Sequence, residues 1–142
     1  MKTKNHIIDW IWVLLIMVII ITLSVIPGEL VWLLMRNTRP ISIVIRPGGF
    51  KVGHVIAYGV LGGLVYRAHR LKRLQNGAAQ RSAAGIGEPF LHPLLIVLGF
   101  AILDELVQHF IPGRTAQLSD VILDTTAALI VMVMYKLIAD SL

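Results

Sequence analysis

Hydrophobic residues gather in four stretches of the chain, separated by polar and turn-forming residues. The stretches cover about residues 10–26, 52–66, 91–110 and 118–138. A helix needs about 20 mainly apolar residues to cross the hydrocarbon core of a bilayer, and each stretch comes near that length. Pro27-Gly28 follows the first stretch and Pro112-Gly113 follows the third, and both pairs are typical helix ends. The pattern predicts an all-α membrane protein, a bundle of four transmembrane helices forming a single domain over residues 1–142.

The second stretch is the shortest and carries glycines at helical spacing. Gly59 and Gly63 lie on one face of the predicted helix, where they would let a neighbouring helix backbone approach closely. Lys51 and Arg67 flank the stretch, and their long side chains can reach the bilayer surface and lengthen the span. We therefore expect this helix to cross the bilayer in close contact with another.

The segments between the stretches differ in length and composition. Residues 29–50 contain Arg39-Pro40 and Arg46-Pro47 and are too long for a tight turn, so we expect them to lie on the membrane surface or fold over the bundle. Residues 67–90 are small and polar in composition, typical of a solvated linker. A short turn after the third stretch predicts an antiparallel hairpin with the fourth.

The distribution of lysine and arginine predicts the orientation, because cytoplasmic loops retain positive charge. The N-terminus, the 67–90 segment and the C-terminal end share one side and hold eight basic residues: Lys2, Lys4, Arg67, Arg70, Lys72, Arg73, Arg81 and Lys136. The other side holds five: Arg36, Arg39, Arg46, Lys51 and Arg114. The bias predicts that both termini are cytoplasmic.

The composition supports a membrane protein and excludes other classes. Hydrophobic residues make up 56% of the chain and charged residues 15%, too few polar side chains to coat a globule. The net charge of +5 does not indicate nucleic-acid binding, because the basic residues flank apolar spans, as they do in membrane proteins. The chain has no cysteine, so disulfides and thiolate metal sites are not available.

Polar residues inside the predicted spans converge on one leaflet. His54 and Tyr58 begin the second helix, Asp104, Glu105 and Gln108 end the third on one face, and Asp120 and Asp124 begin the fourth. Carboxylates within a bilayer cost a few kcal/mol each, so these acids should face inward and meet a basic partner. The available partners are Arg114, His54 and Lys51. We predict one cluster, containing His54, Glu105 and Arg114, that opens toward the outer face.

Each of these residues also has a simpler interpretation. Asp120 and Asp124 could complement the positive end of a helix dipole, with Ser119 as the helix cap. Arg114 could be an exposed loop charge, and His54 could be a hydrogen-bond donor between helices. The other histidines are expected at the interface, and Asp9 and Glu29 are assigned no role. The cluster as a set carries the functional signal, because chance rarely places several acids, a base and an imidazole at one depth.

These residues resemble the VanZ-like membrane protein family over nearly the whole chain. The resemblance rests on a Lys and a His that open one helix with a Tyr one turn later, here Lys51, His54 and Tyr58. It also rests on an Asp-Glu-x-x-Gln, Pro-Gly-Arg, Ser-x-Asp series across the last hairpin. That series reads here as Asp104, Glu105, Gln108, Pro112, Gly113, Arg114, Ser119 and Asp120. The Ser24-x-x-Pro27 end of the first helix is also similar. Family members usually carry Asn at the position of Asp124 and glycines at Ala127 and Ala128, which predicts looser packing of the fourth helix here.

The resemblance implies a cell-envelope role in the inner membrane of a bacterium, with the polar cluster on the extracytoplasmic side. The family's namesake is associated with low-level resistance to the glycopeptide teicoplanin, without a change to the peptidoglycan precursor peptide. That association does not extend to a defined reaction.

Two hypotheses for function follow, and the sequence does not choose between them. In the first, the protein is an enzyme acting on a lipid-linked or amphipathic envelope molecule, and its catalytic residues are His54, Asp104 and Glu105. Its substrate-binding residues are Lys51, Tyr58, Gln108, Arg114, Asp120 and Asp124. A variant places a hard divalent metal between His54 and the carboxylates. In the second, the protein binds lipid or an envelope precursor without catalysis, and the charges form a structural salt-bridge network. A transporter ranks third, since four short helices leave little room for alternating access.

Overall fold

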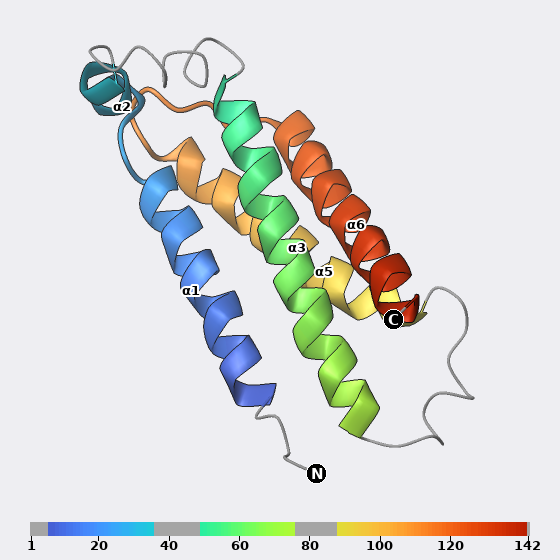
Figure 1. The fold of residues 1–142 in the computed structure, drawn as a ribbon. Helices are drawn as coiled ribbons and strands as arrows, with labels where there is room; N and C mark the ends of the chain where they lie inside the picture. The colour runs from blue at the N-terminus through green and yellow to red at the C-terminus, as the bar shows by residue number, and fades with distance from the viewer. Residues whose placement is uncertain (1–5, 36–48, 76–87, 142) are drawn as a thin grey trace.

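The computed structural model describes residues 6–35, 49–75 and 88–141, and every regular element in these ranges is an α-helix (Figure 1). The predicted all-α class is therefore confirmed for the described chain. The helices are α1 (His6–Ser24), α2 (Gly28–Met35), α3 (Gly49–Gln75), α5 (Glu88–His109) and α6 (Leu118–Asp140). The predicted antiparallel hairpin is formed by α5 and α6, which are joined by a short turn.

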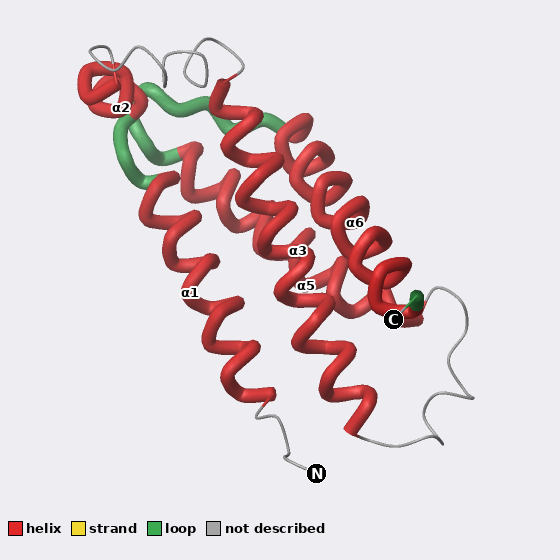
Figure 2. Tube along the Cα trace, viewed as in Figure 1, coloured by secondary structure: helices red, strands yellow, loops and turns green. Residues whose placement is uncertain are grey.

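The four long helices form a bundle around α3. This helix contacts α1, α5 and α6, and its most extensive contacts are with α6. The start of α1, the end of α3 and the end of α6 lie toward one end of the bundle, whereas α2 and the α5–α6 turn lie at the other (Figures 1 and 2). This arrangement of helix ends agrees with the predicted topology. Which end faces the cytoplasm stays a prediction.

Three described helices are long and apolar enough to cross a membrane. They are Ile7–Ser24, Pro89–His109 and Leu118–Asp140. They correspond to the first, third and fourth predicted spans, with α1 beginning four residues earlier than the predicted Trp10 and ending at Ser24. The α3 helix, with 27 residues, is long enough to cross a membrane but is not among the helices that are also apolar enough. It includes glycines and a basic C-terminal part.

Two features of the helices were not predicted. The α3 helix continues from Tyr66 to Gln75 into the segment interpreted as a flexible linker. Its residues Arg67–Leu74 contain good helix formers without glycine or proline, which explains the extension. The α2 helix occupies the start of the segment expected to lie on the surface, and the remainder of that segment, 36–48, lies outside the described residues.

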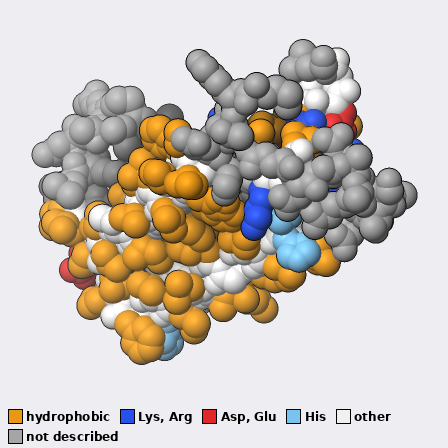
Figure 3. All heavy atoms as spheres, turned by 90° about the horizontal axis from the view of Figure 1, so that it is seen from below, with side chains coloured by type: hydrophobic (Ala, Val, Ile, Leu, Met, Phe, Trp, Pro, Cys, Tyr) orange, Lys and Arg blue, Asp and Glu red, His pale blue; other side chains and the backbone are white. Residues whose placement is uncertain are grey.

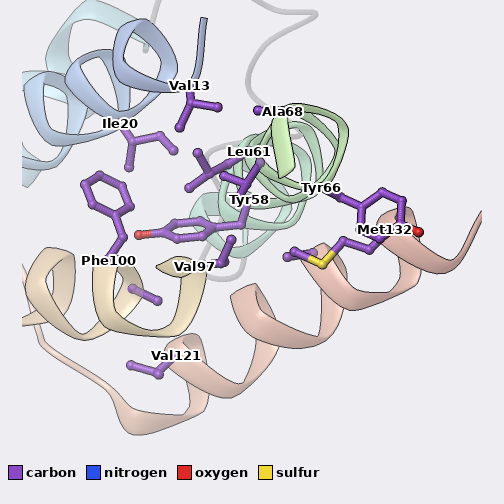
Figure 4. Close-up of a cluster of buried hydrophobic side chains, with 13 residues drawn as sticks. Val13, Ile20, Tyr58, Leu61, Tyr66, Ala68, Val97, Phe100, Val121 and Met132 are labelled. Atoms are coloured by element: carbon purple, nitrogen blue, oxygen red, sulfur yellow. The ribbon is translucent and has the colours of Figure 1, made fainter. Parts of the chain in front are cut away.

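The core of the bundle is built on one face of α3 (Figure 4). Tyr58, Leu61 and Val65 recur at helical spacing on α3 and are completely buried. Figure 4 shows Val13 and Ile20 of α1 reaching them from one side and Met132 of α6 from another. This core holds the polar residues described below at a fixed depth in the bundle.

The closest helix contact joins α3 to α6 at Gly62. A Cβ atom built on Gly62 would lie 2.6 Å from the Cβ of Ala128, so any larger residue would force the helices apart. A Cβ atom built on the predicted contact glycines, Gly59 and Gly63, would instead lie 3.3 and 3.1 Å from methyl groups of Val131. A side chain can shift slightly to relieve such a contact. The prediction therefore identified the correct helix face but missed the residue at closest approach. Ala128 is completely buried against Gly62, and whether α6 packs more loosely than in family members with glycine at this position stays a prediction.

The outer surfaces of α1 and α6 are strongly hydrophobic. Exposed residues include Ile7, Ile11, Leu14, Val18, Ile130, Leu137 and Ile138. Seen from the end that carries both termini, most of the described surface is hydrophobic (Figure 3). Such a surface is unfavourable in water and suits contact with lipid tails.

Candidate functional site

The predicted polar residues meet at the end of the bundle formed by α2 and the α5–α6 turn. Asp104, Glu105 and Gln108 of α5 are all buried, as their shared face predicted. Asp120 and Asp124 of α6 are also buried and face α3. The prediction that the acids point inward is confirmed for all four. Two of them, Asp120 and Asp124, have the predicted basic partners.

The deepest ionisable pair joins α3 to α6. The Nδ1 atom of His54 lies 3.0 Å from Oδ2 of Asp124, and the two side chains are 13% and 0% exposed. The imidazole stacks on Tyr58, with ring centroids 6.0 Å apart and planes only 2° apart. Within the described chain, the second ring nitrogen, Nε2, has no hydrogen-bond partner. The pair therefore fixes the ring while leaving one nitrogen available.

A second hydrogen-bonded group joins α3, α5 and α1. The Tyr58 hydroxyl donates to Oδ2 of Asp104 at 3.2 Å, and the Gln108 amide donates to the same oxygen at 3.2 Å. The Gln108 amide also lies 3.5 Å from the hydroxyl oxygen of Ser24 at the end of α1. All four residues are buried, so this group specifies the relative placement of three helices.

Lys51 lies at the exposed margin of the cluster. Its ammonium group lies 2.9 Å from Oδ1 of Asp120, and the lysine side chain is 42% exposed. The same group lies 3.4 Å from the Ser119 hydroxyl and 3.5 Å from Oε1, the side-chain amide oxygen of Gln117. Solvent screens such a pair, which makes it weak and easily exchanged for another anion.

Glu105 positions the start of α6. Its Oε2 atom accepts a hydrogen bond of 2.7 Å from the backbone N–H of Gln117, the residue before the helix. Ser119 was predicted to cap this helix, and that prediction was wrong. The N-cap residue is Gln117, and the Ser119 hydroxyl lies within donating distance of Oδ1 of Asp120 and Oε1 of Gln117 and accepts no hydrogen bond from a backbone N–H at the start of α6.

Arg114 fastens the α5–α6 turn to the end of α1. Its guanidinium donates to the backbone carbonyls of Leu23 at 3.1 Å and Ile26 at 3.3 Å. Gly113 turns the chain before it with a φ of 75°, a conformation that favours glycine. Burial lowers the pKa of the Arg114 guanidinium, while the nearby Asp104 carboxyl opposes that shift. The residue is therefore only partly exposed and is more than an interfacial loop charge.

His54, Glu105 and Arg114 were predicted to form one cluster. His54 binds the Asp124 carboxylate, Glu105 binds a backbone N–H, and Arg114 binds two backbone carbonyls. They are connected electrostatically. Glu105 interacts with the charge of His54, and Arg114 interacts with the charge of Asp104. The described site is thus a chain of adjacent polar contacts.

Three buried carboxylate oxygens lack a hydrogen-bond partner within the described residues. They are Oδ1 of Asp104, Oε1 of Glu105 and Oδ1 of Asp124. Buried acceptors without partners are rare in proteins, because each one carries the cost of lost hydration. Each of these three buried atoms keeps an unused acceptor position.

The metal variant finds no support in the geometry. Among the described residues, no group of three or more histidine and acidic side chains is arranged to hold a metal ion. Only Asp124 binds His54, whereas Asp104 binds Tyr58 and Glu105 binds the backbone of Gln117.

Some polar contacts involve residues that the sequence did not single out. Asp9, to which no role was assigned, is buried and forms an ion pair with Arg67 at 3.1 Å. Gln117 connects Glu105 and Lys51, although it lies in the turn outside every motif. Neither residue carries a local signal, since their partners lie 58 and 12 positions away along the chain.

Comparison with known protein families gives one match. The profile of the VanZ/LLP1 family matches residues 9–139, which is nearly the whole chain. No curated protein and no solved structure matches the sequence significantly. The match includes all the helices that supply the polar site. The chain therefore belongs to the VanZ/LLP1 family.

Proposed function

We propose that this VanZ-family protein is an integral membrane enzyme that acts on a lipid-linked or amphipathic envelope molecule. The reaction takes place at the polar site, with His54 as the proton-transfer group. The proposal rests on one observation above all, the buried His54–Asp124 pair with an available Nε2 atom.

The His54–Asp124 contact has the form of a catalytic dyad. When Nδ1–H donates to Asp124, the neutral ring carries its lone pair on Nε2, which can then remove a proton from a bound group. The Asp124 carboxylate stabilises the imidazolium that results. The parallel ring of Tyr58 holds the imidazole in one orientation, so the base is positioned before the substrate binds.

The three unpartnered carboxylate oxygens favour a substrate rich in hydrogen-bond donors. Hydroxyl groups of a sugar, or amide N–H groups, can donate to Asp104, Glu105 and Asp124 without adding charge to the site. At the exposed edge of the site, the Lys51 ammonium can leave Asp120 and bind a substrate phosphate instead. A sugar or peptide head group carried on a lipid phosphate presents both kinds of group.

The proposal includes a fourth membrane crossing by α3, through residues 52–66. This part contacts α1, α5 and α6, which bury Tyr58, Gly59 and Gly62, while the face that stays exposed carries hydrophobic residues such as Val52, Ile56 and Val60. With both termini in the cytoplasm, the polar site faces the extracytoplasmic side. Thr115 in the α5–α6 turn and Ser141 at the end of α6 are both exposed and lie at opposite ends of the bundle.

Labelling of single cysteines tests this orientation, because the chain has no cysteine of its own. In intact cells, Thr115→Cys is expected to react with a membrane-impermeant maleimide and Ser141→Cys is not. The reverse pattern would place the polar site in the cytoplasmic half of the membrane.

Turnover in proteoliposomes tests the proposed activity. The purified protein is incubated with isotope-labelled polyprenyl-phosphate-linked sugars and peptides, and products are followed by mass spectrometry. General acid–base catalysis contributes about 100-fold or more, so His54→Gln is expected to reduce turnover by at least that factor. Glu29→Gln is the matched control, because it changes an exposed acid at the same end of the bundle.

The comparison of variants separates catalysis from a structural network. If the wild type shows saturable binding but no turnover, the protein is a binding protein and the catalytic role is wrong. If His54→Gln and Glu29→Gln turn over substrate equally, His54 is not the base.

A further inference from the structure

The opposite end of the bundle has the reverse electrostatic character. It carries the described basic residues of α3 and α6, which are Arg67, Arg70, Lys72, Arg73 and Lys136. The acids at this end are Asp9, Asp140 and Glu88, the first residue of α5, so five positive charges face three negative ones and two are in excess. Figure 3 looks onto this end and shows basic and histidine side chains close together.

Three of these basic residues already have ion-pair partners. Arg67 binds Asp9, and both Arg70 and Lys136 bind Asp140. Arg70 also donates to the Ala139 carbonyl at 3.1 Å, which holds its side chain against the end of α6. Asp9 and Asp140 are therefore already occupied.

Lys72 and Arg73 have no hydrogen bond or ion pair with any described residue. They are adjacent in sequence near the end of α3, and they lie near a stacked pair of histidines. The rings of His69 and His92 are 5.6 Å apart and nearly parallel, joining α3 to α5. Burial, His92 and the two basic residues together lower the pKa of the His69 imidazole. Lys72 and Arg73 thus carry positive charge here without an ion pair to any described side chain.

The depth of this face is indicated by aromatic residues. Tyr66 contacts Phe90 and Tyr135, with ring centroids 5.3 and 5.8 Å away. Aromatic residues gather at the level of lipid head groups. A helix rises about 1.5 Å per residue, so Lys72 and Arg73 lie about 10 Å beyond Tyr66, where lipid phosphates and water are found.

We infer that Lys72 and Arg73, together with His69 and His92, form a binding face for the phosphate groups of anionic phospholipids. Lys72 supplies a mobile ammonium and Arg73 a fork of N–H donors, both suited to phosphate oxygens. The paired residues Arg67 and Arg70 hold α3 so that this face is presented at the head-group level. The inference requires the bundle to lie in a membrane but does not depend on catalysis at the other end.

Lipid binding by the full-length protein in a neutral detergent tests the inference. Native mass spectrometry measures the affinity for phosphatidylglycerol and for phosphatidylcholine of the same chain length. A basic residue near an anionic surface contributes about 1 kcal/mol, or roughly fivefold in affinity. The Lys72→Gln/Arg73→Gln double variant is therefore expected to lose roughly 25-fold of its preference for phosphatidylglycerol.

The matched control exchanges the two basic residues. Lys72→Arg/Arg73→Lys keeps the charge and is expected to keep most of the preference. Inorganic phosphate at the same concentration is expected not to compete, since it lacks the lipid tails that hold a head group at this face. Equal binding of the two lipids by the wild type would overturn the inference, as would an unchanged preference in the Gln double variant or full competition by inorganic phosphate. Proposed catalysis at His54 would survive each of these outcomes.

Discussion

The two ends of the bundle use charge in opposite ways. At the α2 end, four acids are buried and are held by hydrogen bonds from three helices. At the other end, basic side chains extend from the surface of α3, and two of them have no described partner. Burial makes each interaction at the first end costly to break, whereas solvent makes those at the second end weak.

The difference shows which end of the bundle determines how the helices pack. A buried carboxylate is kept only if surrounding groups satisfy it, so the acids dictate how α3, α5 and α6 fit together. At the basic end, Asp9 is buried in the same way and paired with Arg67, whereas Lys72 and Arg73 can respond to the surrounding membrane. Changes at the α2 end should therefore affect folding and function, and changes at the basic end should affect lipid preference.

The largest effect on stability is expected at Asp104. Replacement by Leu removes the acceptor shared by Tyr58 and Gln108 and leaves two buried donors without a partner. Each unsatisfied donor costs about 1–3 kcal/mol, so the expected loss is roughly 2–6 kcal/mol in the free energy of unfolding. Denaturation in detergent, followed by circular dichroism, measures it.

Asp104→Asn is the matched variant, because its amide oxygen can still accept from both donors. Its expected loss is below about 1 kcal/mol. If Asp104→Leu were as stable as the wild type, the buried end would not differ energetically from the basic end and the comparison would fail.

A smaller effect is expected at Arg114. Replacement by Gln removes a charged donor from the carbonyls of Leu23 and Ile26 and should cost about 1–3 kcal/mol. The loss should be local, so hydrogen exchange is expected to accelerate at the end of α1 and in the α5–α6 turn. Uniform acceleration over the whole bundle would show that Arg114 does not act as a local fastening.

Lys51 should behave like a residue of the basic end, although it lies at the buried one. Its pair with Asp120 is partly exposed, so Lys51→Gln is expected to cost less than about 1 kcal/mol. Added salt should reduce the difference further. A loss as large as that of Asp104→Leu would mean that the pair is structural and does not exchange.

The smallest effect is the pH dependence contributed by His69. Its folded pKa lies below the ordinary value of about 6.5, so the unfolded state takes up a proton first as the pH falls. Stability should therefore decline below about pH 7 in the absence of anionic lipid, by a few tenths of a kcal/mol, because solvent screens the half-buried ring.

His69→Gln should flatten this part of the stability profile measured between pH 8 and 5. Phosphatidylglycerol should oppose the decline, since a phosphate favours the protonated ring. An identical profile for the variant would remove His69 from the electrostatics of the basic face.

The sequence predicted the polar site better than the helix boundaries. Paired acids on one face of a helix carry a periodic signal, and their cost in a bilayer requires that they face inward. Asp124 and Asp120 accordingly meet His54 and Lys51 as predicted. The individual partners of Glu105 and Arg114 were not predictable, because both bind backbone groups whose positions depend on the folded turn.

The errors in the fold have a common physical cause. Hydropathy marks where a helix enters lipid, but it does not mark where the helix ends in water. The α3 helix therefore continues past Tyr66 through a polar segment that favours helix, and α2 forms beyond the first span. The closest contact, Gly62 against Ala128, depends on the rotation of two helices about their axes, which residue spacing alone does not determine.

Turnover and unfolding, measured together on His54→Gln, test the central claim most directly. The Gln amide can still donate to Asp124, so the fold is expected to survive while the available Nε2 base is lost. Our account predicts at least a 100-fold loss of turnover with a melting temperature close to that of the wild type. A large fall in melting temperature for His54→Gln and for Asp124→Leu, with stability restored in the double variant, would show that the pair is a structural lock and contradict the proposed function.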